Sequence, residues 1–288
     1  MKLLNVQGFS FSERESHKTI IYDNMLKATK DLVSYVKDNK LEITCMQDFE
    51  KICSYQDESF EFSKLADSVS NLWKDKVIQN EFESNHFIVK DNAKYFLQKL
   101  VEICQSDYIP TDEDILLCNS RTNGTSKLEF YEGRNHFVMY EFEGSKELGD
   151  EILKKYFGGA SAVLFFVSLG EYDLQSEEGN RLILAEKLFE KMCKDKNLDV
   201  HVPIVLFFTK KDVFYEKLKK RRLDYCYPDY KGKNDFEEAS KFIKSRFLRH
   251  TEMPQRIVHV NFICTIDPTQ IKHIFKGLSN MLIEPLRF

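Results

Sequence analysis

The chain has 288 residues, enough for one large domain or two ordinary ones, and its 42% hydrophobic and 31% charged content fits a globular protein. A formal net charge of −4 argues against a general binder of nucleic acid or anionic membranes, because many phosphate contacts need a basic surplus. The seven cysteines form no Cys-x-x-Cys pair, no apolar run is long enough to cross a bilayer, and no signal-peptide or myristoylation pattern is present. We therefore expect a cytosolic protein.

The first third of the sequence shows helical periodicity. Between residues 22 and 108 the apolar side chains recur at helical spacing, as Met25, Leu32 and Val36 illustrate. A further helix is predicted after Asp91-Asn92, which we expect to cap it, and it ends before Pro110. This part of the chain is predicted to be all helical.

Beyond Pro110, short apolar strands alternate with amphipathic helices. This alternation is typical of a parallel sheet with helices on both faces, whose strands are buried on both sides. The predicted strands are 162–167, 204–208 and 257–262, and the predicted helices are 180–192, 236–247 and about 269–283. Residues 128–132 and 136–140, joined through Gly133, are predicted to form a hairpin. The fold class is therefore α/β with a helical domain before it.

A polar run, Thr209-Lys210-Lys211-Asp212, follows the second predicted strand. Open α/β sheets bind ligands at the carboxyl ends of their strands, so the run stands where a site is expected. In an Asn/Thr-Lys-x-Asp motif the aspartate accepts two hydrogens from guanine, the lysine stem lies along the ring, and the first residue ties the loop to its neighbours. Taken alone, the run also fits an ordinary solvated turn.

Several segments resemble, in order, those of heterotrimeric G-protein α subunits. They are Leu72 to Asp75, Tyr108 to Thr111, Val167 to Leu174, Phe207 to Phe214, Tyr225 to Tyr230 and Phe236 to Ile243. The resemblance implies a Ras-like, mostly parallel sheet with an inserted all-helical domain. It divides the chain into residues 1–16, a remnant of the first Ras-like helix and its linker, 17–110, the helical domain, and 111–288, the GTPase domain. The first strand of the sheet would then be missing.

The resemblance also implies the cofactors GTP or GDP and Mg²⁺, and a role for particular residues. The guanine-binding candidates are Thr209, Lys210, Asp212, Cys264 and Thr265. Gly144 is the phosphate-binding candidate, and Thr122 and Glu141 are the candidates for holding magnesium. Thr265 would act through its backbone N–H, so its side chain need not match the family.

The departures from the family concern the phosphates and catalysis. No Gly-x-x-x-x-Gly-Lys-Ser/Thr run occurs in the sequence, Asn119 occupies the position of the catalytic arginine, and Ser145 that of the catalytic glutamine. Arg121 lies two residues beyond the arginine position, and Glu143 adds negative charge near the phosphates. We expect weakened nucleotide binding and lost GTP hydrolysis, so whether the chain is an enzyme stays open.

The family's partners are a βγ dimer, a receptor and an effector, through which the protein would reach the inner face of the plasma membrane. Contacts with the βγ dimer and the receptor are expected to be weaker. The sequence from Met1 to Phe288 lacks the family's N-terminal helix and its receptor-reading tail. Two alternatives are a nucleotide-independent pseudo-GTPase that acts as an interaction module, and a truncated product of a functional GTP-hydrolysing α subunit. No nucleic-acid partner and no transmembrane segment is expected.

Overall fold

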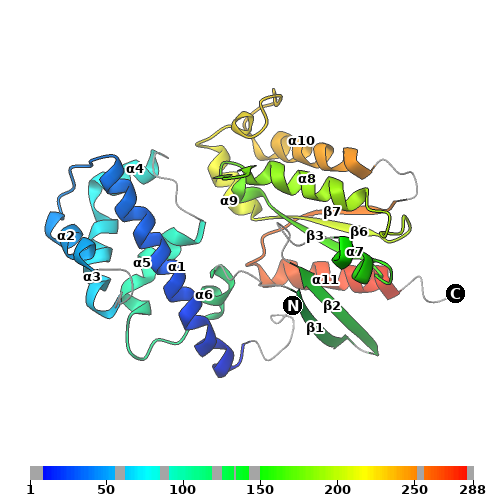
Figure 1. Ribbon diagram of the computed structural model, residues 1–288, viewed down its shortest axis with the longest axis horizontal. Helices are drawn as coiled ribbons and strands as arrows, with labels where there is room; N and C mark the ends of the chain where they lie inside the picture. Colours follow the sequence, from blue (N-terminus) through cyan, green and yellow to red (C-terminus); the bar gives the residue numbers. More distant parts are fainter. Residues whose placement is uncertain are drawn as a thin grey trace. The chain divides into compact units, whose positions relative to one another are not determined.

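The computed structural model describes residues 9–55, 62–84, 91–118, 125–132, 134–142, 150–251 and 256–283. The chain forms two compact units, residues 1–120 and 121–288 (Figure 1). We expected the boundary at Pro110, whereas the helix that follows this proline packs within the first unit. No helix in the described ranges is long and apolar enough to span a membrane.

Every described element of the first unit is a helix. They are α1 (Phe11–Asp38), α2 (Met46–Ser54), α3 (Phe62–Lys74), α4 (Lys76–Glu83), α5 (Asp91–Ile103) and α6 (Asp112–Leu117). Its core brings together α1, α3 and α5, whose apolar faces were visible in the sequence. The central residues include Ile21, Met25, Leu32, Leu65, Val69, Leu72, Trp73, Phe96 and Leu100.

Side-chain caps start several of these helices. Ser10 and Glu13 form a capping box at α1, and Thr111 and Asp114 form another at α6. Asn92, which we expected to cap α5, has a different role. It lies inside that helix, is buried, and donates from Nδ2 to Asn24 Oδ1 at 2.6 Å and to the Leu117 carbonyl at 3.1 Å. It therefore links three helices.

The second unit contains the predicted parallel sheet, with strand order β3-β6-β7. The strands are β3 (Val163–Ser168), β6 (Ile204–Thr209) and β7 (Val258–Phe262). Helix α7 (Asp150–Phe157) precedes the three strands. Between or after them lie α8 (Arg181–Cys193), α9 (Lys211–Leu218), α10 (Phe236–Leu248) and α11 (Pro268–Ile283). Short elements are η2 (Leu169–Glu171), β4 (Gln175–Ser176), β5 (Gly179–Asn180), η3 (Leu223–Tyr225) and η4 (Arg249–Thr251). The parallel register confirms the α/β prediction.

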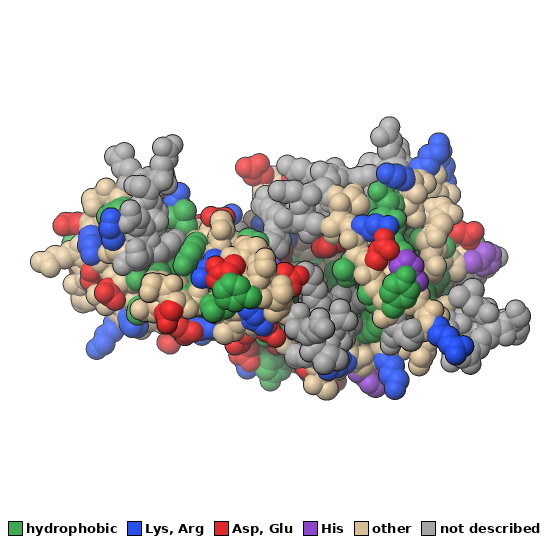
Figure 2. All heavy atoms as spheres, turned by 90° about the horizontal axis from the view of Figure 1, so that it is seen from below, with side chains coloured by type: hydrophobic (Ala, Val, Ile, Leu, Met, Phe, Trp, Pro, Cys, Tyr) green, Lys and Arg blue, Asp and Glu red, His purple; other side chains and the backbone are tan. Residues whose placement is uncertain are grey.

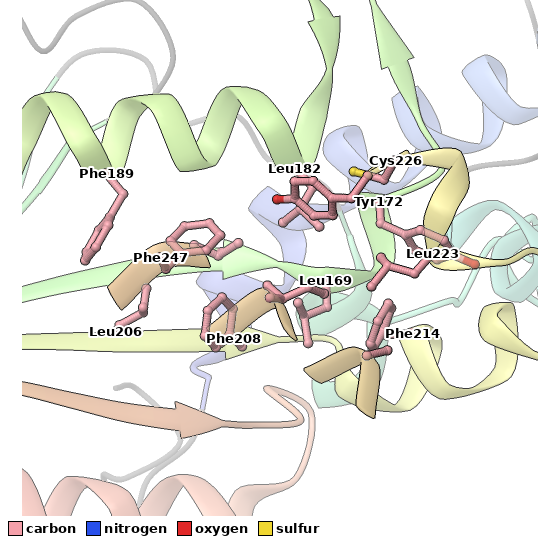
Figure 3. Close-up of a cluster of buried hydrophobic side chains, with 14 of the residues drawn as sticks. Leu169, Tyr172, Leu182, Phe189, Leu206, Phe208, Phe214, Leu223, Cys226 and Phe247 are labelled. Atoms are coloured by element: carbon pink, nitrogen blue, oxygen red, sulfur yellow. The ribbon is translucent and has the colours of Figure 1, made fainter. Parts of the chain in front are cut away.

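Helices cover both faces of this sheet. Helices α8 and α10 lie on one face and α11 on the other (Figure 1). On the first face Phe208 packs edge-on against Phe247 of α10, with ring centroids 5.2 Å apart, and Phe247 also contacts Phe189 of α8 (Figure 3). On the second face Val205 and Phe207 pack towards α11. Side chains that alternate along β6 therefore supply both cores.

The three strands differ in burial. Every residue of β6 is buried, as predicted, whereas β3 and β7 are partly exposed. Phe166 of β3 has 57% of its surface exposed and stacks on Phe207 of β6. Burial on both faces is thus wrong for β3 and β7, because within the described ranges each pairs with β6 alone.

The predicted hairpin is confirmed as β1 (Thr125–Glu132) and β2 (Asn135–Phe142), paired antiparallel. Phe130 and Phe137 stack on each other and contact Phe275 of α11. The opposite face is exposed, and in Figure 2 hydrophobic, charged and histidine side chains mix over it. The alternation of the sequence therefore decides which hairpin face joins the core.

Candidate functional site

The predicted guanine-binding residues lie in two loops at one edge of the sheet. Thr209 ends β6 and α9 begins at Lys211, while Cys264 and Thr265 follow β7. Because β6 and β7 are adjacent and parallel, their carboxyl ends meet at the same edge. The chain topology therefore brings the two loops together from positions more than fifty residues apart.

Backbone hydrogen bonds join these loops. Ile263 N–H donates to the Phe208 carbonyl at 2.8 Å, and Lys211 N–H donates to the Ile263 carbonyl at 3.4 Å. Between these contacts Lys210 adopts a left-handed conformation, with φ 55° and ψ 40°. A non-glycine residue pays about 1 kcal/mol or more for that conformation, so the packing around the turn must hold it in place.

Thr209 ties the first loop to the neighbouring strand. Its side chain is buried, and Oγ1 donates to the Val167 carbonyl of β3 at 3.2 Å. This is the linking role expected from the first residue of the motif. The turn is therefore fixed to β3 on one side and to the loop after β7 on the other.

Cys264 lies in the second loop, within reach of the charge of Asp212 in the first. Burial raises the pKa of the Cys264 thiol, the Ile266 backbone opposes the rise through a hydrogen bond, and the charge of Asp212 adds to it. Cys264 is also fixed through its backbone, because its N–H donates to Gln270 Oε1 at 2.7 Å. The Asp212 side chain is exposed, so its carboxylate is accessible to a ligand.

The sequence analysis assigned no role to Glu171, which lies directly beside the turn. Its carboxylate lies 3.5 Å from Lys210 Nζ and 3.2 Å from a guanidinium nitrogen of Arg181. The following helix is held nearby, because Lys217 Nζ donates to Gly170 O at 2.7 Å and to Asp173 Oδ1 at 2.9 Å. Glu171 belongs to one of the segments that resemble G-protein α subunits, but the sequence did not indicate which residues its carboxylate would contact.

Thr265 is exposed in the second loop, directly after Cys264. The other candidates are not brought to these two loops by any contact among the described residues. Glu141 lies on β2, where its carboxylate accepts a hydrogen bond from Ser126 Oγ at 3.2 Å. Asn119, Arg121, Thr122, Glu143, Gly144 and Ser145 lie outside the described residues.

The groups around the turn suit a purine base better than a metal ion. An exposed carboxylate at Asp212 can accept two N–H donors, and Lys210 and Thr265 lie in the same two loops. Among the described residues, no group of three or more histidine, cysteine, aspartate or glutamate side chains could hold a metal. The magnesium assignment of Glu141 and Thr122 therefore stays a prediction.

A parallel sheet with helices on both faces and a Thr-Lys-Lys-Asp turn at its carboxyl edge defines an α/β domain of the G-protein type. The model of the G-protein alpha subunit family matches residues 1–282. The chain belongs to that family, and membership implies a role in G-protein signalling with βγ and receptor partners.

Proposed function

We propose that this protein is a G-protein α-subunit-like signalling protein that recognises guanine at the corner formed by Thr209, Lys210, Asp212, Cys264 and Thr265. The observation that carries the proposal is the joining of the two loops by backbone hydrogen bonds, which fixes the turn before Asp212 against the loop that continues to Cys264 and Thr265. Adenine lacks the two hydrogens that this carboxylate accepts from guanine, so Asp212 supplies base specificity.

We further propose that nucleotide binding is weakened and GTP hydrolysis lost. By its position in the sequence Glu143 adds a carboxylate near the phosphates, and like charges repel. Asn119 and Ser145 replace an arginine that contributes about 10³ to 10⁵ in rate and a glutamine that orients water. The double variant Asn119→Arg with Ser145→Gln should release more phosphate from GTP than the natural chain, whose release should equal the buffer blank.

The base-recognition proposal has a direct test. Xanthine carries a carbonyl where guanine carries its 2-amino group, so an amide donor suits it better than a carboxylate. Asp212→Asn should bind a fluorescent guanine nucleotide at least about tenfold more weakly and a xanthine nucleotide more tightly. Asp224→Asn, which lies outside the corner and pairs with Arg222, is the matched control and should change neither affinity.

A second candidate, the nucleotide-independent interaction module, also has an observation in its favour. Lys210 pairs with Glu171, so the lysine of the motif has a protein partner without any ligand. If the natural chain shows no saturable binding of guanine nucleotides while Asp212→Asn folds normally and changes nothing, the module replaces the first proposal.

A further inference from the structure

The segment from Lys210 to Lys233 is strongly basic in a chain that is acidic as a whole. It holds nine lysine and arginine residues against four aspartate and glutamate residues, a surplus of five. Because the formal net charge of the whole chain is −4, the other residues together carry −9. The net charge of the whole chain argues against a general binder of anions. This sum nevertheless includes a local basic region.

Six of these side chains form what we call the basic patch: Lys219, Lys220, Arg221, Arg222, Lys231 and Lys233. All of them except the partly buried Arg221 are exposed. They lie on the segment between α9 and α10, which stands out at the top of the α/β unit in Figure 1.

One contact brings the two halves of the basic patch close together. Asn234 donates from Nδ2 to the carbonyl of Leu218, which brings the end of the loop to the end of α9. The charges at 219–222 and at 231–233 thus belong to one surface.

Nearby acidic groups do not cancel this surface. Lys219 Nζ lies 2.6 Å from Glu216 and Arg222 Nε 3.0 Å from Asp224, and all four side chains are 41% or more exposed. Ion pairs at such exposure are weak, so an external anion can exchange with either carboxylate.

Two exposed tyrosines flank the charges. Tyr215 and Tyr225 are 51% and 47% exposed. Lys219 Nζ lies 4.4 Å from the ring centre of Tyr215, and the Arg221 guanidinium lies 4.6 Å from that of Tyr225. An exposed tyrosine beside lysine or arginine suits the headgroup region of a bilayer, because the ring is amphipathic and the cation can meet a lipid phosphate. The aromatic residues therefore agree with a lipid surface.

We propose that the basic patch, with Tyr215 and Tyr225, docks on an anionic membrane surface. The lysine and arginine side chains meet lipid phosphates and carboxylates, and the two tyrosine rings enter the headgroup layer. The acidic remainder of the chain is repelled by the same leaflet, which orients the protein with the patch towards it. This inference goes beyond the proposed function and does not depend on nucleotide binding.

The test is sedimentation of the full chain with vesicles of phosphatidylcholine alone or mixed with phosphatidylserine. Each basic side chain near an anionic leaflet strengthens binding about fivefold. The patch variant Lys220→Gln, Arg222→Gln, Lys231→Gln and Lys233→Gln should bind mixed vesicles at least about tenfold more weakly. The control variant Lys187→Gln, Lys194→Gln, Lys241→Gln and Lys244→Gln changes the same charge at exposed sites on and just after α8 and on α10, and it should bind normally.

A second measurement needs no variant. Raising salt from about 0.1 M to about 1 M shortens the Debye length from about 10 Å to about 3 Å and should release the natural chain from mixed vesicles. Equal losses in the patch and control variants, or no preference of the natural chain for mixed vesicles, would overturn the proposal. So would patch-dependent binding to a single-stranded oligonucleotide or a polyglutamate peptide without any binding to vesicles.

Discussion

Lys210 and Glu171 form an ion pair, 3.5 Å from Nζ to Oε1, that joins the turn after β6 to the residues that follow β3. The lysine stem is the part of the motif that would lie along a purine ring, and Glu171 restrains its charged end. The pair thus connects the turn that we propose for base recognition to a residue outside the two joined loops.

Glu171→Gln should therefore weaken guanine-nucleotide binding by about two- to fivefold, the value of a partly exposed ion pair. The measurement is a titration with a fluorescent guanine nucleotide. Glu237→Gln is the control, because Glu237 forms a longer, more exposed pair with Lys241 at 3.9 Å. An unchanged affinity in Glu171→Gln would show that the pair does not position Lys210.

Asp114 should contribute strongly to the stability of the helical unit. Its buried carboxylate accepts from Tyr95 at 2.7 Å, Tyr108 at 2.9 Å and Lys99 at 2.9 Å, and from the Thr111 N–H. Asp114→Asn leaves Lys99 without its buried counter-charge and should lower the free energy of unfolding by about 2–4 kcal/mol.

The chain's one tryptophan, Trp73, is buried in this unit, so urea unfolding followed by its fluorescence reports the effect. Asp112→Asn is the control, because Asp112 is 45% exposed and pairs with Arg14 at the surface. That variant should cost about 1 kcal/mol or less. Similar decreases in the free energy of unfolding in both variants would mean that the burial of Asp114 contributes nothing to stability.

The stabilisation by Asp114 should depend on pH. Burial alone would raise the pKa of this carboxyl, but hydrogen bonds from Tyr95, the Thr111 N–H and Lys99 outweigh it and lower the pKa to about 2. A lowered pKa gives stability that is complete above the unfolded value of about 3.9 and is lost as pH falls towards 2. The advantage of the natural chain over Asp114→Asn should therefore shrink by about 1–2 kcal/mol between about pH 6 and about pH 3.

The same Trp73 unfolding experiment, repeated across that pH range, measures this change. Tyr95 does not contribute to the change at low pH, because burial, followed by the Asp114 carboxylate, raises the pKa of its hydroxyl to about 12. A constant difference between the two proteins down to about pH 3 would contradict the lowered pKa.

Phe247 should dominate the core on the α8 and α10 face of the sheet. It is fully buried against Phe189 and Phe208, and Phe247→Ala should destabilise the α/β unit by about 3–5 kcal/mol. Phe166→Ala removes the same ring from an exposed position and should cost about 1 kcal/mol or less. Hydrogen exchange of amides in β6 and α8 measures both, and equal protection in the two variants would contradict the assigned core.

The periodicity of the sequence determined the elements and their order. Continuous apolar runs predicted β3, β6 and β7, and the polar run after residue 208 placed a candidate site at a strand end. These features are local, because side-chain alternation and strand length follow from the backbone period. The family was likewise visible from ordered segments along the chain.

Only the tertiary structure decided which charges and polar groups meet. Asp114 belongs to the capping box of α6, yet it also binds Tyr95, Tyr108 and Lys99 from outside that helix. Glu171 had no assigned role until the turn placed Lys210 beside it. Such pairings depend on how distant elements pack, whereas a sequence pattern records only neighbours along the chain.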